Sequence, residues 1–424
     1  MEKCKKWLGL GLLLILISLL AACSGNDGTP TTSDEGGESD TSEISFWAPF
    51  SGPDGPKMKE IVDAYNKSQD KYKVNFQIVP QTEYYKTVDL AFNGEKNMPD
   101  VLIMHGDQIF TYSEKDVLKN LNDLMGDVIT KEQYHEKGIE GATVNGNLFG
   151  VPLDIHPLLF YWNKDLFEAA GLDPDSPPQT REEFLQYAEK LTDTDKNQYG
   201  FAVPTLWPQQ FIFPTIVAQN GGQLYKDGSV NFTSDAVVNA LQFERDLIEK
   251  YKVSPENVQQ DGEVTLFLQG KNAMHLNGPW MLKQWQDAGI NFGVAPVPQL
   301  GTEQQAVYAN SHNFVIPKDV KENKVEGITD FIKYVGDNGM AWAESGQAPA
   351  SKAIYESDEF QEVNKQSPQV AKQFDYVTFT PDVENWGLAT DPLFEAINLT
   401  LLGEKSAEEA LAEAQEKATK ALSN

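Results

Sequence analysis

The sequence predicts an α/β fold, with largely parallel sheets that carry helices on their faces. In residues 44–104, strand-like and helix-like segments alternate in the order strand, helix, strand, helix, strand. A second region of the same kind begins near Gly150. The chain has 424 residues, which is more than one hydrophobic core usually serves, so we expect two or three domains.

The first residues have the features of an export signal. Lysines within residues 3–6 form a positively charged end, and the apolar run at 8–20 is short for a membrane span. The segment Leu20-Ala21-Ala22-Cys23 resembles the lipobox of bacterial lipoproteins. It implies that residues 1–22 are a signal peptide and that Cys23 is acylated. An ordinary secretory signal with a chance cysteine is the alternative.

Residues 23–43 are expected to be a disordered tether, because they are rich in Ser, Thr, Gly, Asp and Glu and have no periodicity. The folded body should begin with a strand at 44–48. Its next elements are expected to be a helix around 58–65, a strand at 74–78, a helix at 85–92 and a strand at 100–104.

Two loops should follow the carboxyl ends of these strands, at 50–55 and at 105–108. In open α/β sheets, ligands bind at such ends. These two loops are therefore candidate ligand-binding segments, and they contain Asp54 and Asp107. Asp54 could instead be only a turn residue, and Asp107 could be a helix N-cap.

The second region has its own order of elements. Thr180 and Glu183 have the spacing of a capping box at the start of a helix that runs to Leu191, and Ser406 and Glu409 repeat it before the last helix. The other expected elements are strands at 158–162, 199–203, 273–276, 294–298 and 313–317, and helices at 163–167, 235–251 and 325–335.

Residues 267–285 combine a strand, a glycine-proline turn and two tryptophans. The strand at 273–276 should end at Asn277-Gly278-Pro279, and Pro279 suits the first turn of a helix. Trp280 would then project from the corner and offer a flat face to a sugar ring or a nucleobase. The alternative is that Trp280 is buried in the core, as large aromatic residues often are.

Composition excludes several classes of function. The formal net charge is -29 and no basic cluster occurs, which argues against a nucleic-acid partner. The only cysteines, Cys4 and Cys23, precede the folded body, so it has no disulfide and no thiolate metal site. Common catalytic and nucleotide-binding motifs are absent from the sequence. We therefore expect no catalytic residues, no metal and no cofactor.

Six motifs resemble those of the family 1 extracellular solute-binding proteins of bacterial ABC sugar importers, the group of the maltodextrin-binding protein. They are GVPLD (150–154), YWNKDLF (161–167), AGL (170–172), PQT (178–180), NGG (220–222) and NGPW (277–280). They occur in the expected order over nearly the whole exported chain.

The resemblance implies a two-lobed periplasmic-binding-protein type II fold that closes like a hinge on a sugar. Each lobe would contain a mostly parallel sheet flanked by helices, and the chain would cross between the lobes three times. The implied crossings lie near 153–156, 294–298 and 347–351. Lobe 1 would comprise 44–153 plus 298–348, and lobe 2 would comprise 154–297 plus 349–424. Alternation of strands and helices alone divides the chain only near 150.

The resemblance also implies ligand contacts. Trp280 matches the stacking tryptophan after the asparagine-glycine-proline turn, and Trp386 falls where the family places another aromatic platform. Asp107 and Asp54 match frequent ligand positions, with Gln108 where maltodextrin relatives have arginine. Asp154 and His156 at the first crossing are either hinge residues or ligand contacts from the floor of the cleft. Trp207, Asn310 and His312 are the remaining candidates, in loops expected to face the cleft. Trp47, Trp162, Trp285 and Trp342 are expected in the core.

The implied partners are a carbohydrate, most simply an oligosaccharide, and the transmembrane subunits of an ABC permease. The protein would be a monomer, held at the extracellular face of the cytoplasmic membrane by its lipid. Two other functions remain open. A secreted glycosidase could use paired carboxylates among Asp54, Asp107 and Asp154. A binder of an anionic solute would need Arg or Lys in the candidate loops, which have almost none.

Overall fold

The computed structural model describes residues 42–50, 52, 54–94, 97–124, 126 and 129–423. The expected signal peptide, Cys23 and most of the expected tether lie outside these residues. The tether was expected to reach residue 43, but Ser42 and Glu43 already pair with Tyr72 and Lys73 in the first strand. No helix within the described part of the chain is both long and apolar enough to cross a membrane.

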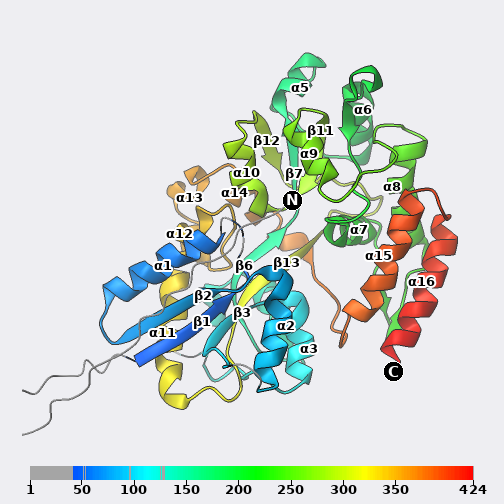
Figure 1. Cartoon of the computed structure of the whole chain (residues 1–424). Coiled ribbons are helices and arrows are strands. Elements are labelled where there is room, and N and C mark those ends of the chain that lie inside the picture. Colours follow the sequence, from blue (N-terminus) through cyan, green and yellow to red (C-terminus); the bar gives the residue numbers. More distant parts are fainter. Residues whose placement is uncertain are drawn as a thin grey trace, which may run out of the picture. The chain divides into compact units, whose positions relative to one another are not determined.

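The first sheet has the strand order β14-β13-β3-β1-β2, and β6 also pairs with β13 (Figure 1). Its strands are β1 (Ser42–Ala48), β2 (Tyr72–Ile78), β3 (Val101–His105), β6 (Val151–Pro157), β13 (Val307–Val315) and β14 (Val377–Thr378). β1 is parallel to β2 and β3, as expected, whereas β13 is antiparallel to β3 and β6.

Alternating side chains of β1 build the core of this sheet. Ile44, Phe46 and Ala48 are fully buried, as period-two alternation predicts. The Phe46 ring lies 5.5 Å from that of Phe331, measured between centroids, which attaches α11 (Glu322–Asp337) to the sheet. The other helices of this region are α1 (Asp54–Ser68), α2 (Gln81–Phe92), α3 (Gly106–Glu114), α4 (Glu136–Gly141) and α12 (Gly339–Ala343).

The second sheet has the order β12-β7-β11-β8. Its strands are β7 (Leu159–Asn163), β8 (Tyr199–Phe201), β11 (Asn272–Asn277) and β12 (Phe292–Ala295). β7 is antiparallel to both β11 and β12, and only β11 and β8 are parallel. The sheet is thus mixed rather than mostly parallel. Its neighbouring strands are not consecutive in sequence, so alternation of strands with helices could not fix their relative directions.

Helices alternate along the chain with the strands of the second sheet. They include α5 (Lys164–Ala169), α6 (Arg181–Leu191), α7 (Gln209–Gln219), α8 (Asp235–Glu249), α9 (Gly262–Leu268) and α10 (Leu282–Asp287). The capping box of α6 is confirmed, because Thr180 Oγ1 accepts from the Glu183 N–H at 3.2 Å and the Glu183 carboxylate accepts from the Thr180 N–H at 3.3 Å. For the last helix, Ser406 accepts from the Glu409 N–H at 3.2 Å.

The last two long helices, α15 (Gly387–Leu401) and α16 (Ala407–Leu422), pack against each other and against α8 (Figure 1). The remaining elements are short: β4 (Thr143–Val144), β5 (Asn147–Leu148), β9 (Tyr225–Lys226), β10 (Ser229–Val230), α13 (Asp358–Glu362), α14 (Ser367–Ala371) and the 3-10 turns η1 (Lys131–Gln133), η2 (Thr194–Lys196), η3 (Pro279–Met281), η4 (Lys352–Ile354) and η5 (Phe374–Tyr376).

Three segments that are distant in sequence lie side by side at Asp154. In β6, Asp154 faces His312 of β13 on one side and Pro349 on the other. The segments expected as first and third crossings, 153–156 and 347–351, are therefore neighbours. The second connection runs from β12 through residues 296–306 into β13, and β13 begins six residues before the expected strand at 313–317. The proposed lobe boundaries remain a prediction.

Candidate functional site

The main candidate site is a cleft of about 1000 Å³, lined by strand residues of the first sheet and by residues of α7, η3 and α10. Seven of the ten residues proposed for ligand contact line it: Asp54, Asp107, His156, Trp207, Trp280, Asn310 and His312. This volume is at the upper end of the range usual for small-molecule sites. Whether these side chains contact a ligand stays a prediction.

Trp280 forms part of an aromatic wall of the cleft. Its ring centroid lies 6.0 Å from that of Trp207 and 5.6 Å from that of Phe211, and Phe211 lies 5.3 Å from Tyr308. Trp280 is only partly buried, so one part of the indole remains available. The alternative that Trp280 is an ordinary core residue does not describe this position.

Local chemistry explains why the indole lies there. β11 ends at Asn277, whose side chain accepts a hydrogen bond from the Gly278 N–H at 2.8 Å. A Cβ atom on Gly278 would lie 2.1 Å from the ring of Trp280, so only glycine lets the indole fold back over the turn. Pro279 starts the 3-10 turn η3, as the sequence predicted.

Asp54 is the first residue of α1 rather than part of a loop, and it is 7% exposed. Its Oδ2 accepts from Gln347 Nε2 at 3.3 Å, and its Oδ1 has no hydrogen-bond partner among the described residues. Burial raises the pKa of Asp54 to about 6, although nearby His312 acts in the opposite direction. A buried acceptor without a partner is costly, and a ligand hydroxyl would satisfy it.

The Asp107 carboxylate, like that of Asp54, has one oxygen without a hydrogen-bond partner among the described residues. The expected loop at 105–108 is the junction of β3 with α3, and His105 rather than Asp107 is the N-cap residue. Asp107 Oδ2 accepts from Gln108 Nε2 at 3.3 Å, while Oδ1 lacks a partner within the described structure. Burial raises the pKa of this carboxyl above its ordinary value. The Asp107 N–H donates to Asn310 Oδ1 at 3.3 Å, which joins two of the predicted residues.

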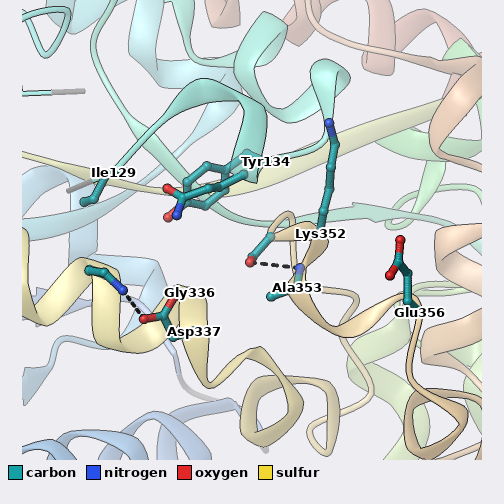
Figure 2. A pocket seen from close by; sticks show the side chains of 10 residues that line it. Ile129, Tyr134, Gly336, Asp337, Lys352, Ala353 and Glu356 are labelled. Atoms are coloured by element: carbon teal, nitrogen blue, oxygen red, sulfur yellow. Dashed lines mark hydrogen bonds and ion pairs between the residues drawn. The ribbon is translucent and has the colours of Figure 1, made fainter. Parts of the chain in front are cut away.

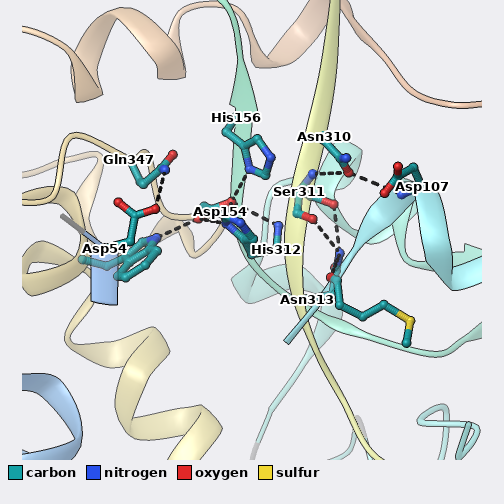
Figure 3. Close-up of polar contacts among 11 residues, drawn as sticks. Asp54, Asp107, Asp154, His156, Asn310, Ser311, His312, Asn313 and Gln347 are labelled. Carbon is teal, nitrogen blue, oxygen red and sulfur yellow. Dashed lines mark hydrogen bonds and ion pairs between the residues drawn. The ribbon is translucent and has the colours of Figure 1, made fainter. Parts of the chain in front are cut away.

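Asp154 lies beneath the cleft and lines neither it nor the neighbouring cavity. It is fully buried, and its carboxylate accepts hydrogen bonds from His156 Nδ1 at 2.9 Å and from His312 Nδ1 at 2.9 Å (Figure 3). It also accepts from the His312 N–H at 3.1 Å and from Trp342 Nε1 at 2.9 Å. Burial alone would raise the pKa of Asp154, but the two imidazoles hold it far below its usual range.

The ligand atoms of Asp154, His156 and His312 lie within 4.8 Å of one another, a spacing that a metal ion could also use. Hydrogen bonds to the carboxylate already occupy both Nδ1 atoms, as described above. His105 adds a third imidazole, with its ring centroid 4.9 Å from that of His312. Burial, and then the neighbouring His312 and His156, hold the pKa of His105 well below its ordinary value.

A second cavity of about 450 Å³ contains the remaining two predicted residues, Gln108 and Trp386. Asp107, Gln210 and Tyr308 line both cavities, so the second adjoins the main cleft. Trp386 is 8% exposed, and its ring packs 5.9 Å from that of Tyr225 and 6.4 Å from that of Phe232. It therefore has a packing role and also forms part of the cavity wall.

A third cavity, of about 310 Å³, lies apart from every predicted site residue (Figure 2). Its lining includes Tyr134, Lys333, Asp337 and Lys352. Lys333 forms an ion pair with Asp337, and Ser351 Oγ accepts from the Ala353 N–H, so these groups already have partners in the protein. None of its features identifies a ligand.

Sequence reasoning missed several residues of the cleft. His105 and Gln347 fell within segments that were singled out, but neither was proposed. Gln210 and Phe211 closely follow Trp207, which was proposed for ligand contact, so their nearness to it was a usable signal. Tyr85 and Tyr308 gave no signal, because their positions depend on the sheet register.

The expected core positions of Trp162, Trp285 and Trp342 are confirmed, whereas Trp47 is only partly buried.

Comparison with known proteins supplies the family. The family described as "Bacterial extracellular solute-binding protein" matches residues 60–369, which is well over half of the chain. The chain belongs to this family. The resemblance noted from the motifs is thereby confirmed.

Two relatives of this solute-binding protein come from Bacillus subtilis (strain 168). A galactooligosaccharide-binding protein is 27% identical, with 96% of this chain and 95% of the relative covered. A maltodextrin-binding protein is 25% identical, with coverages of 80% and 82%.

Solved structures support the fold. An ABC substrate-binding protein of Listeria monocytogenes in complex with cycloalternan has a TM-score of 0.77 at 22% identity, covering 91% of this chain and all of that chain. The cyclic alpha-maltosyl-1,6-maltose binding protein of Arthrobacter globiformis also has a TM-score of 0.77, at 21% identity, covering 90% and 99%. The two-lobed solute-binding fold expected from the motifs is confirmed.

Proposed function

We propose that this solute-binding protein captures a neutral oligosaccharide in the main cleft and delivers it to an ABC permease. One observation supports this function most strongly. An aromatic wall that contains Trp280 and Trp207 lines the same cleft as buried acceptors that have no partner among the described residues, including Asp54 Oδ1 and Asp107 Oδ1. Sugars need both kinds of group, because their ring faces are apolar and their hydroxyls donate hydrogen bonds.

The charges of the cleft favour a neutral ligand. The one lysine among the residues that line it, Lys283, is 63% exposed and forms an ion pair with Asp287 at 2.8 Å. Asp54 and Asp107 would repel a phosphate or carboxylate. An anionic solute is therefore a poor fit to this cleft, whereas hydroxyl groups suit carboxylate acceptors.

The two adjoining cavities favour a ligand of several rings. Asp107, Gln210 and Tyr308 form a shared boundary, and Trp386 lies in the smaller cavity. A chain of sugar rings could occupy the main cleft and continue past this boundary. The names of the Bacillus relatives, which refer to galactooligosaccharides and maltodextrins, support the same ligand class.

A glycosidase is the second candidate, because Asp54 and Asp107 are paired acids in one cleft with raised pKa values. Asp154 is unsuitable as the third acid considered, since it is buried and its oxygens accept four or more hydrogen bonds from protein groups. The family matched is one of binding proteins. Incubation with neutral oligosaccharides for hours should give binding and no hydrolysis products by chromatography. Stoichiometric cleavage would replace the transport function by an enzymatic one.

Delivery would depend on hinge closure and on a lipid anchor. Ligand that contacts both lobes would shift the open–closed equilibrium by its differential affinity for the closed form. We propose further that Cys23 carries the lipid and holds the protein on the extracellular side of the cytoplasmic membrane. Cys23→Ser should release the protein into the medium, which membrane fractionation would detect.

The most economical test of the proposed function is a thermal-shift screen. A ligand present at 100 times its dissociation constant stabilises the folded state by about 2.7 kcal/mol. Neutral oligosaccharides of varied linkage and length should include at least one that raises the melting temperature. Small-angle scattering with that sugar should then show a smaller radius of gyration. An unchanged radius at saturation would contradict hinge closure.

A further inference from the structure

Three of the five histidines of the chain gather at the floor of the cleft, and each has its Nδ1 held by a protein group. Asp154 binds Nδ1 of His156 and of His312 at 2.9 Å, and the Tyr85 hydroxyl lies 2.7 Å from Nδ1 of His105. All three rings line the cleft, whereas Asp154 does not. Their Nε2 atoms have no hydrogen-bond partners within the part of the chain that the structure describes.

Asp154 and Tyr85, the two groups that hold these Nδ1 atoms, differ in whether they can donate a hydrogen bond. A carboxylate can only accept, so the neutral rings of His156 and His312 must carry their protons on Nδ1. Their Nε2 atoms are then acceptors. Trp342 Nε1–H also donates a hydrogen bond to Asp154, and the pKa of this carboxyl lies far below its usual range. Asp154 is therefore ionised.

His105 has the opposite arrangement. The Tyr85 hydroxyl accepts from the His105 backbone N–H at 3.0 Å, and burial raises the pKa of this phenol, so the hydroxyl keeps its proton. Nδ1 of His105 is the acceptor available to that proton among the described residues. The neutral ring therefore carries its own proton on Nε2, which is a donor.

We propose that Asp154 and Tyr85 are positioning residues that fix the protons of the cleft-floor histidines, so that two Nε2 acceptors lie beside one Nε2–H donor. This proposal rests on the proposed sugar-binding function and deepens it. Two neighbouring ring hydroxyls match such a floor, because one can donate to His312 or His156 while the other accepts from His105. A ligand segment without hydroxyls would leave these polar atoms unpaired, which costs affinity.

The test is nitrogen NMR of protein labelled with 15N-histidine, recorded without ligand at a pH where the rings are neutral. Long-range proton–nitrogen correlations distinguish protonated from unprotonated ring nitrogens. His156 and His312 should be protonated on Nδ1, and His105 on Nε2. Substitution of each histidine in turn assigns the signals. Protonation of His156 or His312 on Nε2 alone would overturn the proposal, as would a stoichiometric metal found by elemental analysis on their Nδ1 atoms.

Asp154→Asn sharpens this test. An asparagine side chain offers one acceptor oxygen and one donor nitrogen, so one of the two rings should change its protonated nitrogen from Nδ1 to Nε2 while the other keeps it. A role in packing alone would leave both rings unchanged. If this variant does not fold, Tyr85→Phe serves instead, and only His105 should lose its single defined tautomer.

The proposed proton positions and the proposed sugar binding can be refuted separately. The NMR experiment needs no sugar, so the wrong tautomers would refute the positioning role even in a protein that binds oligosaccharide. The expected tautomers in a protein that binds no sugar would leave the positioning of the protons intact and refute the proposed ligand. With a bound oligosaccharide, the Nε2 signals of His105 and of His312 or His156 should shift, and unchanged signals of all three rings would overturn the contact with ring hydroxyls.

Discussion

A Cβ atom on Gly278 would lie 2.1 Å from the indole ring of Trp280. The turn after β11 and the proposed stacking surface therefore depend on each other. Gly278 has a φ of -85°, so an alanine would meet a steric conflict there rather than a forbidden backbone conformation.

Gly278→Ala should displace the Trp280 ring from its position in the cleft wall and thereby weaken oligosaccharide binding. Because the ring is at the cleft and only partly buried, we expect a small change in melting temperature. Calorimetric titration and thermal unfolding measure the two effects. Gly289→Ala, in open space at a φ of 66°, is a comparison variant that should leave affinity unchanged. Equal affinity of wild type and Gly278→Ala would contradict the role of the turn.

Asp107→Asn should weaken binding and raise stability. The carboxylate is a buried acceptor with one oxygen unpartnered among the described residues, and burial raises its pKa. Replacing it removes a charge-assisted hydrogen bond to the ligand, worth about 1.5 to 3 kcal/mol, and also removes the cost of an ionised group in this site. Calorimetry and urea unfolding at pH 7 test both signs. A variant that loses stability and keeps affinity would make Asp107 structural.

Trp386→Ala should affect long ligands more than short ones. Its indole lies in the smaller cavity, beyond the boundary formed by Asp107, Gln210 and Tyr308. If sugar rings reach this cavity, a tetrasaccharide should lose affinity and a disaccharide held in the main cleft should not. Titrations with a homologous series measure the difference. Equal losses for all lengths would mean that the substitution acts through packing against Tyr225 and Phe232.

Glu244 gives the folded state a specific pH dependence. It is 1% exposed on α8, Gln209 is its side-chain partner, and burial raises its pKa to about 8. A raised carboxyl pKa means that the native state binds the proton more tightly than the unfolded state. The contribution of Glu244 to stability is thus greatest below its ordinary pKa and is lost as pH rises towards 8.

Glu244→Gln keeps the shape of the side chain and removes the titration. As pH rises from 5 to 9, the free energy of unfolding of the variant should increase relative to that of wild type, by about 2 to 5 kcal/mol in total. Urea unfolding at several pH values gives this difference directly. Parallel pH curves for the two proteins would show that Glu244 titrates normally in the native state.

Local sequence patterns predicted part of this molecule well. The short apolar run at 44–48 identified β1, and Thr180 with Glu183 marked the start of α6. The turn before Trp280 was visible because glycine and proline interrupt a strand. These features depend on neighbours in sequence, which is why sequence reasoning could reach them.

Other features depend on pairing between distant segments. All seven residues of β6 are buried, so no alternation distinguished the buried Asp154 from the cleft-lining His156. The contact of Asp154 with His312 and Trp342 arises because β13 and α12 pack at β6, although these two residues lie 158 and 188 positions from Asp154 in the sequence. The pairing of β7 with β11 and β12 was beyond local patterns for the same reason.

The proposed function requires that a neutral oligosaccharide binds in the main cleft against Trp280. Isothermal titration of wild type and Trp280→Ala with the sugar found by thermal screening tests it most directly. We expect one site per chain in the wild type and a loss of about 1 to 3 kcal/mol in the variant, by analogy with the stacking of bases on aromatic rings. Both unliganded proteins should have the same melting temperature. Unchanged affinity in Trp280→Ala would contradict it.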